Sequence, residues 1–358
     1  MKLNDFDYTL SKDLIAQYPL KERQKARLMV LDRETGAISD DVFENIINYF
    51  KEGDALVLND TKVIPARLFA KRKTGGKVEV FLLASPEKNS LSGLEKKNPV
   101  SEVLLRPSGR LKKGEEVILE SGDRVEVLDR GDIGRFVKFD RPLDEILKEC
   151  GHTPLPPYIK RADEPSDKED YQTIYARGDG ATASPTAGLH FTKDLLKQIE
   201  DKGVKVCYIT LHTSYGTFAP VKVDNVENHR MHAEYFNMPV WTAKTISETK
   251  KKGSRIFAVG TTSARVLEHY FSPRSTVPAL PAGRHGPQSM KGYTDLYIYP
   301  PYKFKVVDCL ITNFHLPKST LLLLVSAFAG KDFIFKAYNH AIEKEYRFYS
   351  YGDAMLIV

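Results

Sequence analysis

The sequence has few of the residues that form cross-links or hold structural metals. Its 358 residues include three cysteines, Cys150, Cys207 and Cys309, which lie far apart and share no CxxC spacing. An odd number of dispersed cysteines argues against a disulfide framework and against a structural zinc site. A reducing compartment is therefore expected, and the cytoplasm is the simplest one.

Long apolar segments are missing as well. The most apolar run, residues 321–329, has about half of the roughly 20 residues that a membrane-spanning helix requires. The first ten residues, MKLNDFDYTL, include acidic side chains and no apolar stretch, so we expect no secretory signal. These features predict a protein that works away from membranes.

Common catalytic and nucleotide-binding motifs are also absent. The sequence contains no GxSxG nucleophile elbow, no GxxxxGK[ST] phosphate loop, no GxGxxG fingerprint and no HExxH metal motif. The group that comes closest to a metal-binding motif is His229, His232 and Glu234. On a helix the two histidines would share a face and Glu234 would fall off it. We therefore expect no bound metal, no ATP hydrolysis and no hydride transfer.

The composition is that of a globular protein with room for two domains. Hydrophobic residues make up 42% and charged residues 28% of the chain, which is typical of sequences that bury a core. The net charge of +6 permits a polyanionic partner without requiring one.

Two kinds of pattern divide the chain. Between residues 68 and 142, short alternating segments such as KVEVFLLA and DRVEVLD are separated by glycine and aspartate turns, which indicates a small antiparallel barrel. Elsewhere, apolar strands alternate with amphipathic helices, which indicates an α/β layer with mixed strand directions. The predicted fold class is a discontinuous α/β main domain, residues 1–67 and 152–358, with an inserted small antiparallel β-barrel domain, residues 68–151.

Individual elements follow from the spacing of apolar residues. Strands are predicted at residues 54–59, 204–211, 255–260 and 306–312, and helices at residues 192–202, 239–251, 263–270 and 321–329. Thr192 is expected to cap the first of these helices. Two polar segments, residues 85–100 and 272–291, are predicted to be surface loops.

Five polar runs follow predicted strands or open predicted helices. They cover residues 59–62, 184–191, 212–218, 260–263 and 312–320. Open α/β sheets bind ligands at the carboxyl ends of their strands, so we expect these runs to meet at one site. The run SPTAGLHF, residues 184–191, carries a histidine in a glycine-rich loop and is the most unusual of the five.

Two of these runs reach the start of a helix. Free backbone N–H groups and the helix dipole favour a carboxylate or phosphate there. Thr261, Thr262, Ser319 and Thr320 are equally consistent with ordinary N-caps, and the sequence leaves both interpretations open. The chemistry remaining for such a cleft is one in which the substrates themselves are reactive.

These motifs resemble, nearly from end to end, those of the S-adenosylmethionine:tRNA ribosyltransferase-isomerase family of queuosine biosynthesis. The matching segments are LIAQYPLKERQKARLMVLDR (residues 14–33), LVLNDTKVIPARL (56–68), YQTIYA (171–176), SPTAGLHFT (184–192), ENHRMHAE (227–234), VGTTSARVLE (259–268) and YTDLYIYPPYKFKVVDCLITNFHLPKSTLLLLVSAFAG (293–330). So many ordered motifs make the resemblance specific.

The resemblance implies a fold and a reaction. The fold is a discontinuous α/β domain with a β-barrel inserted after DTKVIPAR. The reaction transfers and isomerises the ribosyl part of S-adenosylmethionine onto 7-aminomethyl-7-deazaguanine at the tRNA wobble position, giving epoxyqueuosine, adenine and methionine. S-adenosylmethionine is then a co-substrate, and no further cofactor is expected. We expect a cytoplasmic monomer that binds tRNA.

The resemblance also suggests roles for particular residues. His190, His212 and His315 are candidates for proton transfer, because a near-neutral imidazole can act as acid or base. Arg265 is a candidate partner for the methionine carboxylate, and Glu234 and Asp295 for the ribose hydroxyls or the sulfonium. The predicted substrate-binding set is Asn59, Asp60, Thr186, Gly188, Glu234, Thr261, Thr262, Arg265, Asp295 and Asn313.

A basic patch near the barrel is predicted to follow the RNA backbone, with binding that weakens as salt rises. The predicted RNA-binding residues are Lys62, Arg67, Lys71, Arg72, Arg106 and Arg110, with Lys73, Lys112 and Lys113 nearby. The alternative is an ordinary solvated charged face. Tyr215 and Phe218 are candidates for stacking on the wobble base.

Other interpretations remain open at this stage. A non-catalytic RNA-binding protein on the same fold would have no need of the intact SPTAGLHF, GTTS and TNFHLPKST runs. Another S-adenosylmethionine-dependent RNA-modifying enzyme, such as a methyltransferase, is disfavoured by the missing glycine-rich loop. Thr213, Ser214 and Tyr215 depart from the small apolar and glycine residues usual in the family, which bears on how substrate sits beside His212.

Overall fold

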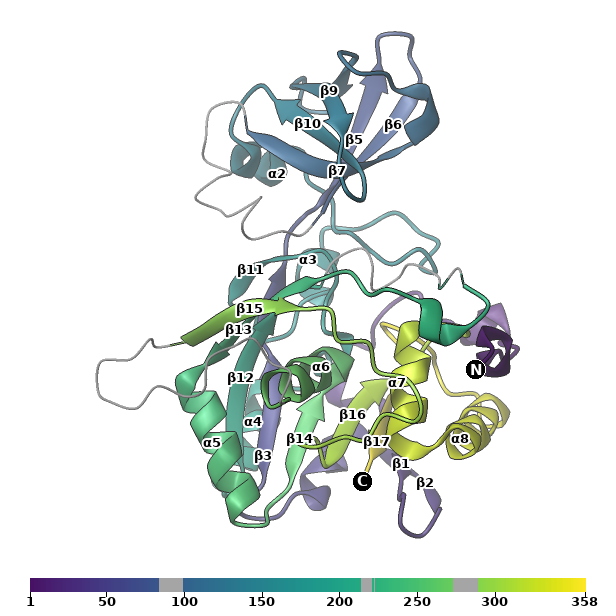
Figure 1. Cartoon of the computed structure of the whole chain (residues 1–358), viewed down its shortest axis with the longest axis vertical. Helices are drawn as coiled ribbons and strands as arrows, with labels where there is room; N and C mark the ends of the chain where they lie inside the picture. The colour runs from purple at the N-terminus through teal and green to yellow at the C-terminus, as the bar shows by residue number, and fades with distance from the viewer. Residues whose placement is uncertain (84–98, 214–220, 222, 273–288) are drawn as a thin grey trace.

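The computed structural model describes residues 1–83, 99–213, 221, 223–272 and 289–358, apart from the side chain of Arg110. Figure 1 shows a β-barrel at the top of the view and a larger α/β part below it. The α/β part is built on a sheet of nine strands. In spatial order they are β15 (Ser289–Thr294), β13 (Glu234–Pro239), β12 (Lys205–Leu211), β3 (Ala55–Asn59), β14 (Ile256–Val259), β16 (Cys309–Asn313), β17 (Ala354–Ile357), β1 (Arg27–Leu31) and β2 (Ile38–Val42).

Four neighbouring strands in the middle of this sheet run parallel. These are β12, β3, β14 and β16, and their carboxyl ends therefore lie at one edge. Strand β3 is buried at all five positions, as expected for a strand covered on both faces. Ala55 and Val57 join one hydrophobic core, and Leu56 and Leu58 join the other.

Helices cover both faces of the sheet. The first core contains apolar side chains from α5 (Val240–Lys251), α6 (Gly260–Tyr270), α7 (Thr320–Ala329) and α8 (Lys331–Glu343). The second core contains apolar side chains from the short helix η4 (Phe43–Tyr49) and from α4 (Lys193–Asp201). The hydroxyl of Thr192 accepts a hydrogen bond from the backbone N–H of Leu195, so the predicted cap of α4 is confirmed.

The smaller part is a closed antiparallel barrel with its own core. Its strands, in spatial order, are β10 (Arg135–Phe139), β7 (Val100–Arg106), β6 (Lys77–Leu82), β5 (Arg67–Arg72), β8 (Glu116–Leu119) and β9 (Arg124–Arg130). Helix α2 (Leu143–Cys150) packs Leu143, Ile146 and Leu147 into that core. The predicted fold class, an α/β framework carrying an antiparallel barrel, is confirmed. The domain boundaries at 67/68 and 151/152 stay a prediction.

The remaining elements are short. A parallel pair, β4 (Thr61–Val63) and β11 (Gly178–Ala181), stands apart from the large sheet, and α3 (Asp167–Asp170) is a single turn. The other 3-10 turns are η1 (Leu3–Phe6), η2 (Lys12–Leu14), η3 (Arg23–Lys25), η5 (Ser108–Arg110), η6 (Thr186–Gly188) and η8 (Val226–Asn228).

The structure corrects the bounds of three predicted elements. The helix predicted at 263–270 already begins at Gly260, where a φ of +83° lets strand β14 turn directly into α6. The strand predicted at 306–312 begins only at Cys309, because the backbone N–H groups of Val306 and Val307 donate to the carboxylate of Glu268.

The third correction concerns the predicted loop at 272–291. Its last three residues belong to β15, which pairs with β13 along its whole length. The rest of that loop, residues 273–288, and most of the loop predicted at 85–100 lie outside the described residues. The same holds for Ser214, Tyr215 and Phe218.

Candidate active-site cleft

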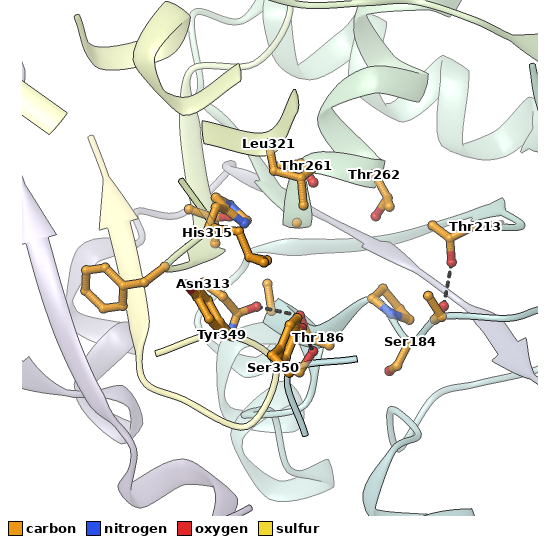
Figure 2. Close-up of a pocket in the computed structure, with 18 residues that line it drawn as sticks. Ser184, Thr186, Thr213, Thr261, Thr262, Asn313, His315, Leu321, Tyr349 and Ser350 are labelled. Carbon is orange, nitrogen blue, oxygen red and sulfur yellow. Dashed lines mark hydrogen bonds between the residues drawn. The ribbon is translucent and has the colours of Figure 1, made fainter. Parts of the chain in front are cut away.

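A cleft lies at the carboxyl ends of β14 and β16 (Figure 2). Its walls come from segments far apart in sequence, and the lining residues are Tyr158, Ala183, Ser184, Pro185, Thr186, Ala187, Thr213, Gly260, Thr261, Thr262, Thr312, Asn313, Phe314, His315, Leu316, Leu321, Tyr349 and Ser350. The cleft thus joins four of the five predicted polar runs.

Three polar atoms in the cleft wall are buried and lack a hydrogen-bond partner among the described residues. They are the Oγ of Ser184, the Oγ1 of Thr262 and the Nδ2 of Asn313. A buried polar group left unpaired costs free energy, so such atoms are suited to a polar ligand. Together they offer two hydroxyls and one amide donor.

Asn313 is held in place by Thr186. The Oγ1 of Thr186 donates to the Oδ1 of Asn313 at 2.7 Å, a contact drawn in Figure 2. Because Oδ1 accepts this bond, Nδ2 is the end of the amide that remains for a ligand. Two side chains predicted to bind substrate therefore form one unit.

The start of α6 forms another part of the cleft wall. Its N-cap position is Val259, which makes no side-chain cap, and Thr261 and Thr262 lie inside the first turn. The capping interpretation is therefore wrong for these two threonines. The first backbone N–H groups of a helix have no partner within it and favour an anion. In α7, Ser319 is the N-cap and Thr320 is the first helical residue.

His315 is anchored at three points beside the cleft. Its backbone N–H donates to the hydroxyl of Tyr338 at 2.8 Å, and its carbonyl accepts from the hydroxyl of Tyr8 at 2.5 Å. Its Nε2 lies 2.7 Å from the Oγ1 of Thr312. Burial lowers the pKa of His315 to about 3, so the ring is neutral near pH 7.

The other two predicted histidines do not line this cleft. His190 borders a smaller cavity with Arg23, Asp170 and Ser350, and Ser350 also lines the main cleft. Its ring lies against Phe43, with 4.9 Å between the ring centroids, and burial lowers its pKa to about 4. Its buried Nε2 has no hydrogen-bond partner among the described residues.

His212 directly precedes Thr213, which lines the cleft. Its Nδ1 is 2.8 Å from the hydroxyl of Thr61, and its ring stacks on Tyr235. A Cβ added to Gly180 would lie 3.0 Å from Nε2, so the chain packs closely on that side. Burial lowers the pKa of His212 to about 4.

Asn59 and Asp60, at the end of β3, bond to protein groups. The amide of Asn59 donates to the carbonyl of Leu211 and accepts from the backbone N–H groups of Leu211 and Thr61. Asp60 accepts from the hydroxyl of Thr210 at 2.7 Å, and burial raises its pKa. Neither residue lines the cleft.

Arg265 and Glu234, predicted as separate substrate ligands, form a buried ion pair with each other. The guanidinium of Arg265 also donates to the carbonyl of Leu296 at 3.0 Å. Asp295 is exposed and does not line the cleft. Gly188 packs against Tyr175, because an added Cβ would lie 1.9 Å from the tyrosine hydroxyl oxygen.

The sequence interpretation missed an aromatic wall made by Tyr158 and Tyr349. Their ring centroids lie 4.7 Å apart, and both residues line the cleft. Tyr349 has a φ of +69°, which is unusual for a bulky residue and marks a conformation imposed by its surroundings. Residues 152–157, HTPLPP, are rich in proline, but no local pattern joins Tyr158 to Tyr349.

Most of the predicted RNA-binding cations are paired with carboxylates. Lys62 lies 3.2 Å from Asp179, Arg67 lies 3.4 Å from Glu79, Arg72 lies 2.7 Å from Glu115, and Arg106 lies 3.9 Å from Glu79. Of the additional cations, Lys73 pairs with Glu116 and Lys113 with Asp129. Lys71 is exposed and, within the described ranges, makes no ion pair. The side chain of Arg110 lies outside the described residues.

The described residues contain neither a candidate metal cluster nor a helix that could span a membrane. No group of three or more histidine, cysteine, aspartate or glutamate side chains there is arranged to hold a metal ion. No helix in that part of the chain is long and apolar enough to cross a bilayer.

A polar cleft at the carboxyl edge of parallel strands, with unpaired hydroxyl and amide groups, defines a class of enzyme that binds a small polar substrate. The family described as "Queuosine biosynthesis protein" matches residues 3–357. The chain therefore belongs to this family, and the resemblance noted in the sequence is confirmed.

Named relatives match the chain over its whole length. A protein of Sulfurihydrogenibium sp. (strain YO3AOP1) is 51% identical over 360 residues, and one of Thermotoga maritima is 46% identical over 359 residues. Each alignment covers 100% of both chains, and both relatives are named S-adenosylmethionine:tRNA ribosyltransferase-isomerase. A crystal structure of the S-adenosylmethionine tRNA ribosyltransferase from Thermotoga maritima aligns with a TM-score of 0.55 at 37% identity, covering 99% of this chain and 100% of that one.

Proposed function

We propose that this protein is an S-adenosylmethionine:tRNA ribosyltransferase-isomerase and that S-adenosylmethionine binds in the cleft of Figure 2. Membership of the family supports the reaction. The observation that supports the site is the set of unpaired polar atoms on Ser184, Thr262 and Asn313 in one cleft. A ribosyl donor with hydroxyl, amine and carboxylate groups matches such a wall.

The N-terminus of α6 is proposed to bind the methionine carboxylate. Its free backbone N–H groups and its dipole favour an anion, and the unpaired hydroxyl of Thr262 adds a donor. Arg265, the ligand suggested by the sequence, is already neutralised by Glu234. The N-terminus of α6 can stabilise the negative charge of the carboxylate without breaking that ion pair.

The aromatic wall is proposed to contact the purine. The rings of Tyr158 and Tyr349, tilted by 50° to each other, line the cleft next to hydroxyl-bearing residues. Purine rings stack on such side chains. This placement would leave the ribose facing Asn313 and His315.

His315 is the proposed partner of the reacting nucleoside, because it is the one predicted histidine that lines the cleft. The sulfonium of S-adenosylmethionine acidifies the neighbouring ribose methylene, and departing adenine needs a hydrogen-bond donor. His190 and His212 remain candidates for proton transfer. Replacing each with alanine and measuring adenine release tests them, and full activity would remove that residue from consideration.

The tRNA is proposed to approach along the barrel. A hollow on its surface is bordered by Lys71, Lys77, Arg106 and Phe69, among other residues. Exchanging Lys71 and Lys77 for glutamate should weaken RNA binding and reduce its salt dependence, by a slope of about one for each lost phosphate contact. Lys244→Glu on α5 is the matched control, and an equal effect there would argue against the barrel.

The compartment, the cofactor requirement and the oligomeric state are also proposals. Three free cysteines suit a reducing cytoplasm, and the reaction needs no cofactor beyond S-adenosylmethionine as co-substrate. The protein is proposed to act as a monomer, which sedimentation of the active enzyme can test.

One assay tests the proposed reaction. The full-length protein is incubated with S-adenosylmethionine and an anticodon stem-loop carrying 7-aminomethyl-7-deazaguanine. We expect adenine release together with an RNA heavier by the transferred and isomerised ribosyl group. A methyl-sized mass gain, or RNA binding without adenine release, would contradict the proposal.

A further inference from the structure

The contact between Thr312 and His315 has a consequence for the proposed reaction. Thr312 is the fourth residue of β16, and its hydroxyl oxygen lies 2.7 Å from Nε2 of the imidazole. Thr312 is 1% exposed and His315 is 7% exposed. The pair is therefore shielded from bulk water, and the hydrogen between them must be assigned to one partner.

We infer that Thr312 is a positioning residue that holds His315 as the Nδ1–H tautomer, so that a neutral imidazole donates a hydrogen bond from Nδ1 into the cleft. The inference rests on the proposed function for its catalytic meaning. It adds a residue, Thr312, and a protonation state to that proposal.

The hydroxyl hydrogen of Thr312 indicates where the ring proton of His315 sits. Among the described residues, the side chain of Thr312 has no hydrogen-bond partner except Nε2 of His315. If Nε2 carried the proton and donated it, the buried hydroxyl hydrogen would have no acceptor in the protein, which is costly. If the hydroxyl donates to Nε2, both groups are satisfied and the ring proton sits on Nδ1.

The other ring nitrogen of His315, Nδ1, makes no hydrogen bond to any described residue. The backbone N–H and carbonyl of His315 are bonded to the hydroxyls of Tyr338 and Tyr8, and Nε2 is bonded to Thr312. The ring is thus anchored on its protein side, and Nδ1 is the atom left for a ligand in the cleft that His315 lines.

The imidazole of His315 is uncharged near neutral pH. Burial lowers the pKa of His315 to about 3, so no positive charge develops beside a substrate that already carries a sulfonium. A neutral imidazole can still polarise a substrate by donating a hydrogen bond. When the bond from ribose to adenine breaks, its electron pair moves onto the purine, and a hydrogen bond from Nδ1 to a purine nitrogen stabilises that charge until the purine takes a proton from water and leaves as adenine. His315 keeps its proton throughout.

A tautomer measurement tests this assignment without relying on activity. Full-length protein labelled with ¹⁵N-histidine is examined by long-range ¹H–¹⁵N correlation NMR between pH 6 and 8, and His315→Gln identifies the His315 signals. We expect the Nδ1–H pattern throughout this range in the wild type, and a loss of that single pattern in Thr312→Val. An Nε2–H or doubly protonated ring in the wild type would overturn the inference.

Kinetics test the functional consequence. Thr312→Val should lower kcat for adenine release by about 10- to 100-fold with a smaller change in KM, and Thr312→Ser should restore most of it. Thr242→Val is the control, because Thr242 lies on α5 and donates to the carbonyl of Tyr208 on β12, and neither residue lines the cleft. Wild-type kcat in Thr312→Val would overturn the positioning role. Absence of adenine release by the wild type would instead contradict the proposed function, while the NMR result would still decide the tautomer.

Discussion

At the scale of single residues, Asn313 shows how the cleft is prepared for a ligand. Its Oδ1 accepts from Thr186, and its Nδ2 is buried without a partner among the described residues. The amide orientation is thus set by the protein, and the free donor faces the site. Replacing Asn313 with aspartate keeps the shape of the side chain and removes the Nδ2 donor, and so tests this arrangement.

Asn313→Asp is expected to raise KM for S-adenosylmethionine by tenfold or more. The substitution replaces the Nδ2 donor with an oxygen and adds a negative charge, so an acceptor on the substrate would lose its hydrogen bond and be repelled. Initial rates of adenine release at varied S-adenosylmethionine measure the effect. Exposed Asn225→Asp serves as the control, and equal KM values in the two variants would count against a substrate contact at Asn313.

The sequence predicted part of this site. Thr186, Thr261, Thr262, Asn313 and His315 were expected to meet because they follow strands, and parallel strands bring their ends together. No pattern in the sequence indicated that Arg265 and Glu234 would form an ion pair with each other, since they lie 31 residues apart. Tyr158 and Tyr349 were missed because tertiary packing alone places them together.

At the scale of elements, the start of α7 connects helix stability to the cleft. The hydroxyl of Ser319 accepts from the backbone N–H of Leu322 at 3.2 Å and donates to the carbonyl of Leu316 at 2.7 Å. His315, Leu316 and Leu321 on either side line the cleft. The N-cap therefore also fixes the segment that carries His315.

Ser319→Ala is expected to cost about 1 kcal/mol of stability and to raise KM for S-adenosylmethionine a few-fold. The matched control is Thr192→Ala, which removes the equivalent cap of α4 away from the cleft. Urea unfolding and adenine-release kinetics on both variants separate the two effects. If both variants lose equal stability and neither changes KM, the cap has no role in the site.

Element types were predicted better than their bounds. The spacing of Leu195, Leu196 and Ile199 was sufficient for α4, because one amphipathic face packs on the sheet. The start of β16 was missed because residues 306 and 307 donate to Glu268, a contact invisible to a pattern of apolar residues. The strand β15 was missed because its partner β13 lies 55 residues earlier in the chain.

At the scale of the whole molecule, buried neutral histidines make stability depend on pH. Burial lowers the pKa values of His190 and His212 to about 4 and that of His315 to about 3. An unfolded histidine binds a proton below about pH 6.5, whereas these buried rings stay neutral until the pH approaches their folded values. The unfolded state therefore binds more protons in this window, and stability falls as pH falls.

We expect the free energy of unfolding to decrease between pH 6.5 and 4, with each of the three histidines contributing up to about 1 kcal/mol per pH unit. Urea unfolding at several pH values measures the slope. His212→Gln should reduce it, whereas Thr242→Val, which removes no titrating group, should leave it unchanged. The same slope in the wild type and in His212→Gln would show that His212 does not contribute.

We propose that the cleft between the ends of β14 and β16 holds S-adenosylmethionine. A crystal or cryo-EM structure of the protein with S-adenosylmethionine and an unreactive anticodon stem-loop tests it most directly. We expect density for the nucleoside within hydrogen-bond distance of Nδ2 of Asn313 and Nδ1 of His315, and for the carboxylate at the start of α6. Density in the cavity beside His190 or in the hollow on the barrel, with the cleft empty, would contradict the account.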